Sequence, residues 1–457
     1  MTENRQTKNK KNEIDMTTGA LLPKILIFLV PLIASSTLQL LFNAADVVVV
    51  GRYAGANALA AVGANSALIN LATNIFIGLS VGTNVVAAMY YGAGKYNELR
   101  ETISTSVVVG LIGGVFLIVV GLLFAGPMLI LMGTPAEVEP LAELYLKIYF
   151  LGMPAMLLYN FGAAVLRAAG DTKRPLFYLL YAGVINIVLN LFLVIVCKMG
   201  VAGVAIATVV SQIVSAVLVL LCLINNEGDM SLDVKKLSIN RRRMREIVAV
   251  GIPAGIQGML FSFSNVLIQS SVNSFGAIAV AGNTAASNVE GFVYMAMNAS
   301  SQASVSFTGQ NYGAHKRDRI LKVLGYCCLT TTLTSIIIGY PAFWGARGIL
   351  SLYSSDSAVI EFGVRRLSII LTTYFLCGLM EIPVGVMRGM GHGVAPVIIS
   401  LLGACGLRIV WIFTVFQINR TPEVLYISYP VTWIVTFVVQ MIALAVVWKK
   451  ESKRYKQ

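Results

Sequence analysis

Charged residues are scarce in this chain. They make up 12% of its 457 residues, against 57% hydrophobic residues, and the mean hydropathy is +0.79. A soluble globular domain carries about twice that share of charge. The composition therefore excludes a large soluble catalytic domain and indicates a membrane protein with room for at most about a dozen helical spans.

Residues that bind metals or carry redox chemistry are also few. The two histidines, His315 and His392, lie in polar stretches without cysteine or carboxylate at ligand spacing, and the six cysteines form no CxxC pair. Zinc-protease (HExxH) and P-loop patterns are missing as well. We therefore expect no enzyme activity, no catalytic residue, no resident metal and no cofactor.

Acidic residues are outnumbered by basic ones. The chain has 34 Lys and Arg against 21 Asp and Glu, a net charge of +13. The basic residues fall in short clusters between apolar runs and form no basic, aromatic-rich face of the kind that binds nucleic acid. Most of them lie in the segments that would be inside if the N-terminus is cytoplasmic, which predicts that both termini are cytoplasmic.

The apolar runs predict an all-α polytopic membrane protein with twelve transmembrane helices. The first six spans are expected near 25–50, 58–90, 102–124, 144–166, 175–196 and 201–224. The other six are expected near 247–272, 277–307, 323–343, 367–387, 394–416 and 424–447.

The second half of the chain repeats the first 221 residues further on. Tyr91 to Lys95 (YGAGK) matches Tyr312 to Lys316 (YGAHK), and Gly55 and Arg167 match Gly276 and Arg388. An even number of spans separates the copies, so we expect two six-helix lobes of the same orientation, related by a pseudo-twofold axis along the membrane normal. Parallel repeats are typical of transporters; a duplicated scaffold or a channel is the alternative. The predicted domains are a cytoplasmic tail (1–24), an N-lobe (25–224), a cytoplasmic linker (225–246), a C-lobe (247–448) and a second cytoplasmic tail (449–457).

Three carboxylates lie inside predicted spans, where a charge at the bilayer centre costs about 2.5 to 3.5 kcal/mol even on a lenient scale. Asp46 ranks first, because it lies about one helical turn from Asn43 and its charge could be switched by a proton or a bound cation. It could instead be a solvated residue at a span end. Glu290 could be held structurally by a neighbouring Asn or Ser, and Glu381 could pair with Arg388 or snorkel to the inner interface.

Uncharged polar residues in the spans are candidates for lining a substrate cavity. The alternative is that they join helices to one another by hydrogen bonds. The first-half candidates are Asn65, Asn70, Asn186, Asn190 and Thr208, and the second-half candidates are Gln257, Asn265 and Asn283.

Three stretches together resemble the multidrug and toxic compound extrusion (MATE) family, and the resemblance covers nearly the whole chain. The first is the stretch from Pro31 to Asp46 followed by GANALAAV at 55–62. The others are VLRAAGDTKRP at 165–175 and TGQNYGA at 308–314. Each stretch alone is modest evidence, and the combination is specific.

The resemblance implies two six-helix lobes in a V shape and a monomer in the bacterial plasma membrane. It further implies alternating-access antiport of organic cations or other drugs against protons or sodium. The family's cation site falls on Asp46, Asn186, Asn190 and Thr208, and Pro31 would let the first span bend. Many members have Asp at the position of Asn190. The single acid here favours protonation over tight sodium binding, although sodium could bind transiently at Asp46.

A lipid or lipid-linked sugar flippase is the alternative function, since related folds move such substrates. A flippase would show a cationic cavity for pyrophosphate, whereas Arg408 is the main interior arginine that the predicted spans contain. A major-facilitator transporter would carry a GxxxDR-type motif after the second span, where this chain reads YGAGKYNELR.

Overall fold

The structure is a computed structural model that describes residues 13–226, 228 and 230–454, nearly all of them helical. In this part of the chain, ten helices are long and apolar enough to cross a membrane, and the bent pair α5–α6 makes an eleventh. The 37-residue helix α10 (Ala277–Gly313), which is rich in Ser and Asn, supplies the twelfth span. The predicted all-α, twelve-span fold is confirmed.

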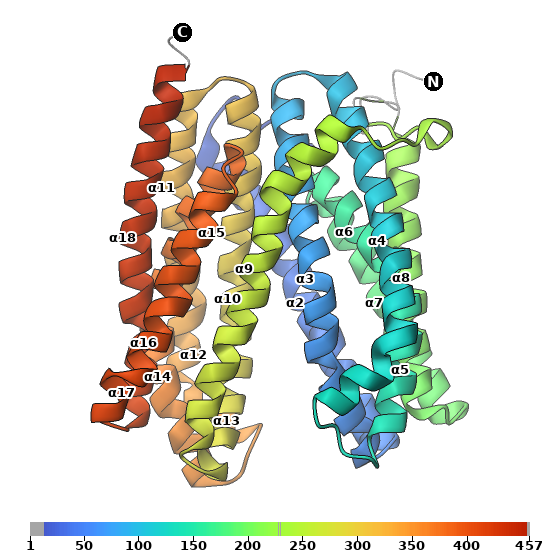
Figure 1. Cartoon of the computed structure of the whole chain (residues 1–457), viewed down its shortest axis with the longest axis vertical. Helices are drawn as coiled ribbons and strands as arrows, with labels where there is room; N and C mark the ends of the chain where they lie inside the picture. Colours follow the sequence, from blue (N-terminus) through green and yellow to red (C-terminus); the bar gives the residue numbers. More distant parts are fainter. Residues whose placement is uncertain (1–12, 227, 229, 455–457) are drawn as a thin grey trace. The chain divides into compact units, whose positions relative to one another are not determined.

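The helices form two compact units (Figure 1). Helices α2 (Leu21–Tyr53) and α9 (Arg241–Asn273) contribute residues to both. In α2 the change of unit falls at Val30, next to Pro31, and in α9 it falls after Gly255, two residues beyond Pro253. Unit 1 comprises Met1–Asp15 and Val30–Gly255, and unit 2 comprises Met16–Leu29 and Ile256–Gln457.

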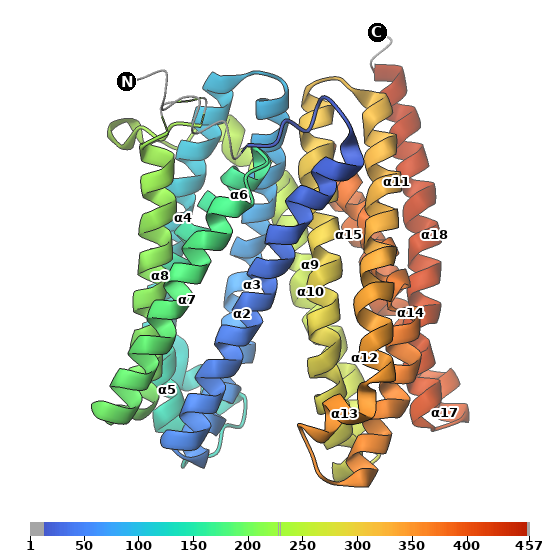
Figure 2. The same ribbon diagram turned by 180° about the vertical axis from the view of Figure 1, so that it is seen from behind.

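Unit 1 consists of antiparallel helices joined by short turns. Figure 2 shows α2 and α7 side by side, with α8 beside α7. The predicted fourth span is two helices that meet at Gly152 with a bend of 48°. Besides parts of α2 and α9, the unit contains α3 (Ala56–Gly92), α4 (Tyr96–Leu131), α5 (Glu139–Leu151), α6 (Met153–Ala168), α7 (Lys173–Leu191) with a π-helical turn η1 (Phe192–Val196), α8 (Gly200–Ile224) and the 3₁₀ turn η2 (Val234–Lys236).

Unit 2 is built around α10, which packs along most of α14 (Ser357–Gly389). The predicted tenth span, 367–387, is too short, because α14 begins ten residues earlier than its apolar run suggests. The remaining elements are α11 (Arg317–Thr334), η3 (Ser335–Gly339), α12 (Tyr340–Trp344), α13 (Ala346–Ser351), α15 (Val394–Ser400), η4 (Leu401–Gly406), α16 (Leu407–Phe413), α17 (Val415–Ile418) and α18 (Pro422–Arg454).

The residues of the predicted tails are described only in part, since 1–12 and 455–457 lie outside the described residues. Met16, in the predicted first tail, is fully buried in unit 2. Its backbone N–H donates to Oε1 of Gln310 at 3.2 Å, and its carbonyl accepts from Nδ2 of Asn311 at 3.1 Å. Part of the TGQNYGA stretch therefore anchors the segment that precedes α2. The predicted second tail continues α18 as far as Arg454.

The internal repeat is visible in the backbone. Helices α3 and α10 each have 37 residues and begin after Gly55 and Gly276, both with φ of 91°. The turns that follow also match, because Gly94 and His315 adopt left-handed conformations at φ of 67° and 57°. Histidine is strained there, whereas glycine is not. The two halves of the sequence therefore share the same helix length, the same backbone conformation at the helix start and the same left-handed turn.

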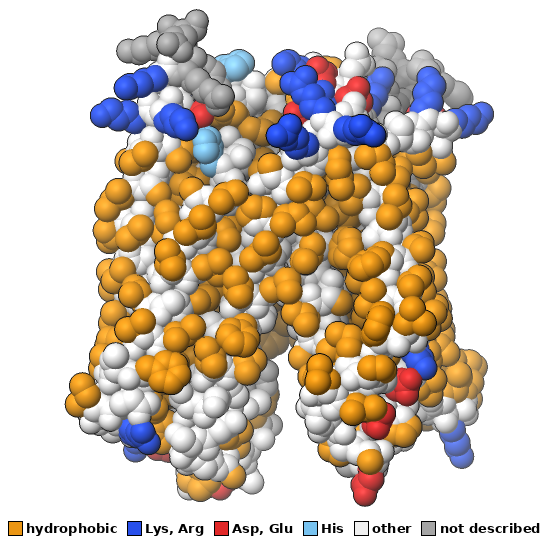
Figure 3. Space-filling model, viewed as in Figure 1, with side chains coloured by type: hydrophobic (Ala, Val, Ile, Leu, Met, Phe, Trp, Pro, Cys, Tyr) orange, Lys and Arg blue, Asp and Glu red, His pale blue; other side chains and the backbone are white. Residues whose placement is uncertain are grey.

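The surface carries the charge pattern of a membrane protein (Figure 3). Apolar side chains cover the middle of each unit on the face drawn, and Lys and Arg gather at one end of each. On α4, Ile112, Phe116 and Leu123 are all more than half exposed. Such a belt is costly in water and favourable in lipid.

Candidate functional site

Asp46 meets two other helices of unit 1. The Nδ2 of Asn190, on α7, donates a hydrogen bond to Oδ1 of Asp46. The hydroxyl of Thr208, on α8, lies 3.5 Å from the other carboxylate oxygen and 3.0 Å from the carbonyl oxygen of Val204. Because a hydroxyl has one proton to donate, Thr208 can turn toward either acceptor. The structure thus brings together three residues that the sequence analysis had grouped.

Two amide oxygens of α7 have no donor. Asn186 and Asn190 are four residues apart, so they share a helix face, and both are buried. The Oδ1 atom of each accepts no hydrogen bond from the described residues. A buried acceptor without a partner is costly, and amide oxygens are ligands that hard cations accept. Either oxygen could therefore accept from a proton donor or bind a small cation.

No cationic side chain of the described residues balances the charge of Asp46. Its carboxylate is partly buried, and within the described residues it forms no ion pair; its polar partners are the neutral Asn190 and Thr208. A carboxylate in apolar surroundings is stable when paired or neutralised. Its charge state therefore depends on what binds to it.

The other first-half candidates behave differently. Asn43 is exposed, and the described residues include no hydrogen bond between it and Asp46. Asn65 is fully buried and donates to the carbonyl of Ala142 at 2.9 Å, which joins α3 to α5 as the structural alternative expected. Asn70 is exposed. Their place in a substrate cavity stays a prediction.

Glu290 is neutralised by an arginine that the sequence analysis missed. Both of its oxygens accept from Arg366, from Nε and Nη2 at 2.7 Å each, and both side chains are buried. Glu290 is thus held structurally, as one alternative proposed, but by an arginine and not by a neighbouring Asn or Ser. Arg366 also donates to Oδ1 of Asn283. Arg366 lies just before the predicted start of its span, where it looked like a residue of a polar loop.

Glu381 lies on a cavity of about 580 Å³ within unit 2. Asn265, Asn283 and Glu290 line the same cavity, and whether it receives a substrate stays a prediction. In the described structure Glu381 forms no ion pair with Arg388, contrary to one alternative, and Arg388 donates to Oε1 of Gln257 at 2.7 Å. Gln257, which was predicted to line a substrate cavity, thus accepts a hydrogen bond from Arg388.

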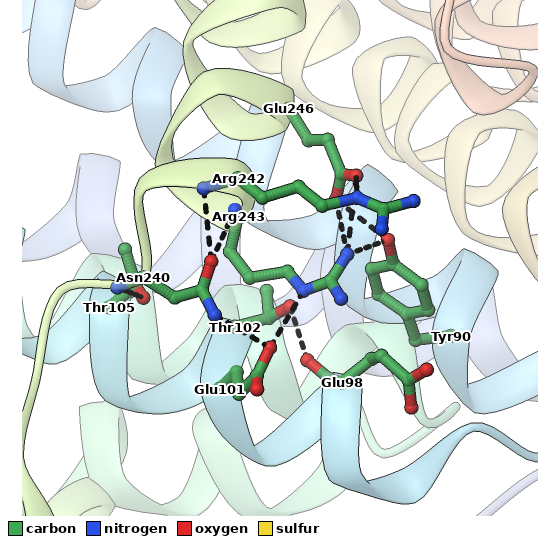
Figure 4. Close-up of polar contacts among 9 residues, drawn as sticks. All are labelled: Tyr90, Glu98, Glu101, Thr102, Thr105, Asn240, Arg242, Arg243 and Glu246. Carbon is green, nitrogen blue, oxygen red and sulfur yellow. Dashed lines mark hydrogen bonds and ion pairs between the residues drawn. The ribbon is translucent and has the colours of Figure 1, made fainter.

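A polar network joins the start of α9 to α3 and α4 in unit 1 (Figure 4). Arg243 pairs with Glu101 at 3.0 Å and with Glu246 at 3.1 Å. It also donates to the hydroxyl of Tyr90, which itself donates to Glu246 at 2.7 Å. The Lys and Arg residues of the predicted linker, 225–246, had been interpreted only as evidence for the orientation of the chain in the membrane. One of them, the mostly buried Arg243, also bonds the start of α9 to α3 and α4.

No group of three or more His, Cys, Asp or Glu that could hold a metal occurs in the described parts of the chain. Asp46 and the two residues that bond to it contribute the oxygen atoms of one carboxylate, one amide and one hydroxyl. Such a set can take up a proton or a weakly held sodium ion.

Known proteins resemble this chain along nearly its whole length. The MatE family model matches twice, over residues 31–192 and 253–414. The probable multidrug resistance protein YoeA of Bacillus subtilis is 29% identical over 435 residues, 93% of this chain and 94% of the relative. The probable multidrug resistance protein NorM of Thermotoga maritima is 26% identical over 383 residues, 83% of this chain and 82% of the relative. A solved outward-facing multidrug resistance MATE family transporter of the MOP superfamily has a TM-score of 0.89 at 20% identity and covers 96% of this chain and 99% of its own.

Proposed function

This chain belongs to the MatE family, and from that premise we propose that it is a cation-coupled multidrug antiporter of the bacterial plasma membrane. It would export organic cations or other amphipathic small molecules by alternating access, with both termini cytoplasmic. The relatives named as multidrug resistance proteins support drug export. They give no support to a lipid flippase.

The observation that carries the proposal is the environment of Asp46. Its partners are a neutral amide and a neutral hydroxyl on α7 and α8, whereas the carboxylate of Glu290 is already held by Arg366. A switchable charge needs a carboxylate whose partner can come and go. Asp46 meets that requirement and Glu290 does not.

Ion and drug drive each other through their different affinities for two conformations. Uptake of a cation at Asp46 removes the negative charge that Asn190 and Thr208 solvate, so it changes the bonds that join α2 to α7 and α8. The inward movement of one charge is driven by about 2.3 kcal/mol per 100 mV of membrane potential. A drug that binds better to the ion-free state is then released when the ion binds.

The experiment uses the purified full-length chain in liposomes, with ethidium as the cationic probe and an imposed ion gradient. Asp46→Asn is expected to reduce gradient-driven ethidium transport to the level of empty liposomes, since the amide cannot exchange a proton. Asp318→Asn, at an exposed position in the first turn of α11, is the matched control and should transport normally. Ethidium transport by Asp46→Asn at the wild-type rate would refute the assignment.

The same liposomes separate the two coupling ions. A proton gradient without sodium is expected to drive transport, because one carboxylate offers a hard cation little anionic charge. A sodium gradient at equal pH on both sides should drive it weakly. Transport that requires sodium would contradict proton coupling at Asp46.

A further inference from the structure

The cavity of unit 2 combines charge with aromatic walls. Its volume of about 580 Å³ lies in the range of about 300–1,000 Å³ that is typical of sites for small molecules. Helices α9, α10, α14, α16 and α18 all contribute to its lining, together with η4. The charged residues on it are Glu290, Arg366, Glu381 and Arg408.

The charges of Glu290 and Arg366 cancel each other. Arg366 holds Glu290 through two hydrogen bonds of 2.7 Å, a bidentate geometry that satisfies both carboxylate oxygens. A ligand therefore meets this pair as a neutral, already bonded group. Glu381 and Arg408 remain to interact with it.

Arg408 is a buried cation without an anion. Its side chain is 6% exposed, and nowhere in the described structure does it form an ion pair. Its Nη2 donates to the hydroxyl of Thr432 at 3.2 Å, while its Nε has no acceptor among the residues that the structure describes. Burial of a guanidinium is costly unless an anion or acceptors replace its water. Arg408 lines the cavity, so its guanidinium is suited to an incoming anionic group.

A row of aromatic rings starts at Arg408. Its guanidinium lies 4.0 Å from the centroid of the Tyr429 ring. The Tyr429 ring lies 5.6 Å from that of Trp433, which in turn lies 5.6 Å from that of Tyr374. All three rings line the cavity. Aromatic walls of this kind bind flat rings by stacking and edge contacts.

We propose that this cavity binds small aromatic compounds that carry a carboxylate or similar anionic group, and that Arg408 pairs with that group. The planar guanidinium offers a fork of donors that matches a carboxylate, and the neighbouring rings accept the aromatic body. The claim that such compounds are exported rests on the proposed function. The claim that the cavity binds them does not.

The test measures binding without any gradient or transport, so its failure is distinct from failure of the antiport proposal. The purified full-length chain in maltoside micelles is titrated calorimetrically with 2-naphthoate and with the neutral isostere 2-naphthamide. The wild type should bind the naphthoate at least about tenfold more tightly, as expected for a charge-assisted bond. Equal affinity for the two probes would overturn the proposal.

Variants assign the effect to Arg408. Arg408→Gln should lose the preference for naphthoate, and Arg408→Lys should keep part of it. Arg420→Gln, at an exposed arginine outside the cavity, should bind like the wild type. A folded Arg408→Gln protein with unchanged naphthoate affinity would refute the assignment.

Glu381→Gln gives a second test that keeps Arg408 in place. Because it removes a negative charge from the same cavity wall, naphthoate should bind several-fold more tightly. Unchanged or weaker binding would contradict an anion in this cavity. Binding of dodecyl phosphate without binding of naphthoate would likewise overturn the proposal in favour of a lipid headgroup.

Discussion

Asn190 decides how much negative charge would surround a cation bound at the proposed site of Asp46. Its amide donates to Asp46 and leaves its own oxygen without a donor. Asn190→Asp would put two carboxylates in contact, and one of them must then hold a proton or share a cation. We expect this variant to couple to sodium, with a half-saturating sodium concentration about tenfold lower than that of the wild type. Sodium-dependent ethidium transport and sodium-dependent thermal stabilisation would measure it.

The control for this prediction is Asn160→Asp. Asn160 donates to the carbonyl of Met156 within α6 and does not contact Asp46. This variant should leave the response to sodium unchanged. An Asn190→Asp protein that is folded, active and indifferent to sodium would show that the second acid does not supply sodium coupling.

Single residues of the site were predictable where a pattern placed them on one helix face. Asn186 and Asn190 share such a face, and the family resemblance brought Thr208 to Asp46. Arg366 was missed because it lies one residue before the predicted span, in the sequence VRRLSIIL. A charged residue at a helix end looks the same in sequence whether it faces water or a buried Glu290. Tertiary contacts decide between these cases, and hydropathy does not report them.

At the scale of helices, glycines permit the contact between α3 and α9. A Cβ atom on Gly78 would lie 2.3 Å from the backbone nitrogen of Gly255 and 2.5 Å from the carbonyl oxygen of Gly251. Backbone atoms cannot turn aside, so Gly78→Ala must push the helices apart. We expect a loss of stability of about 1–3 kcal/mol, measured as a lower thermal midpoint in detergent.

Gly63→Ala is the matched control, because Gly63 lies in the same helix with no atom within 4 Å of its added Cβ. Alanine should stabilise the helix there by about 0.5–1 kcal/mol. If the two variants melt at the same temperature, close packing of α3 on α9 does not contribute to stability.

Hydropathy located every span but placed several ends wrongly. Helix α4 runs from Tyr96 to Leu131, although only 102–124 was predicted, because its polar first turns resemble a loop in composition. The bend at Gly152 escaped notice because the apolar run continues through Pro154, which lies in the first turn of α6, where its missing N–H costs little. Apolar length predicts that a segment crosses the membrane, whereas capping and proline determine where each helix starts.

At the scale of the molecule, the duplication was predictable. That α2 and α9 each contribute residues to both units was not. The 221-residue repeat predicted two similar halves, and the matched turns at Gly94 and His315 agree with it. The assignment of Met16–Leu29 to unit 2 and of the start of α9 to unit 1 depends on contacts between distant segments. No local pattern encodes those contacts.

The two shared helices carry the prolines suited to a hinge. Pro31 and Pro253 lack the N–H that would bond the carbonyls of Ile27 and Ala249, so each helix is easier to bend near the residue where it changes unit. Replacement by alanine restores one hydrogen bond, worth about 1 kcal/mol. If alternating access bends both helices, each replacement should slow ethidium transport about fivefold.

The double variant Pro31→Ala/Pro253→Ala should therefore transport more than about twentyfold more slowly than the wild type. Pro127→Ala is the control, because Pro127 interrupts α4 within unit 1 alone and far from any change of unit. Stopped-flow transport by the three proteins in the same liposomes decides the matter. Equal rates for the double variant and the wild type would mean that α2 and α9 move as rigid rods, and conformational change would then have to arise in the loops.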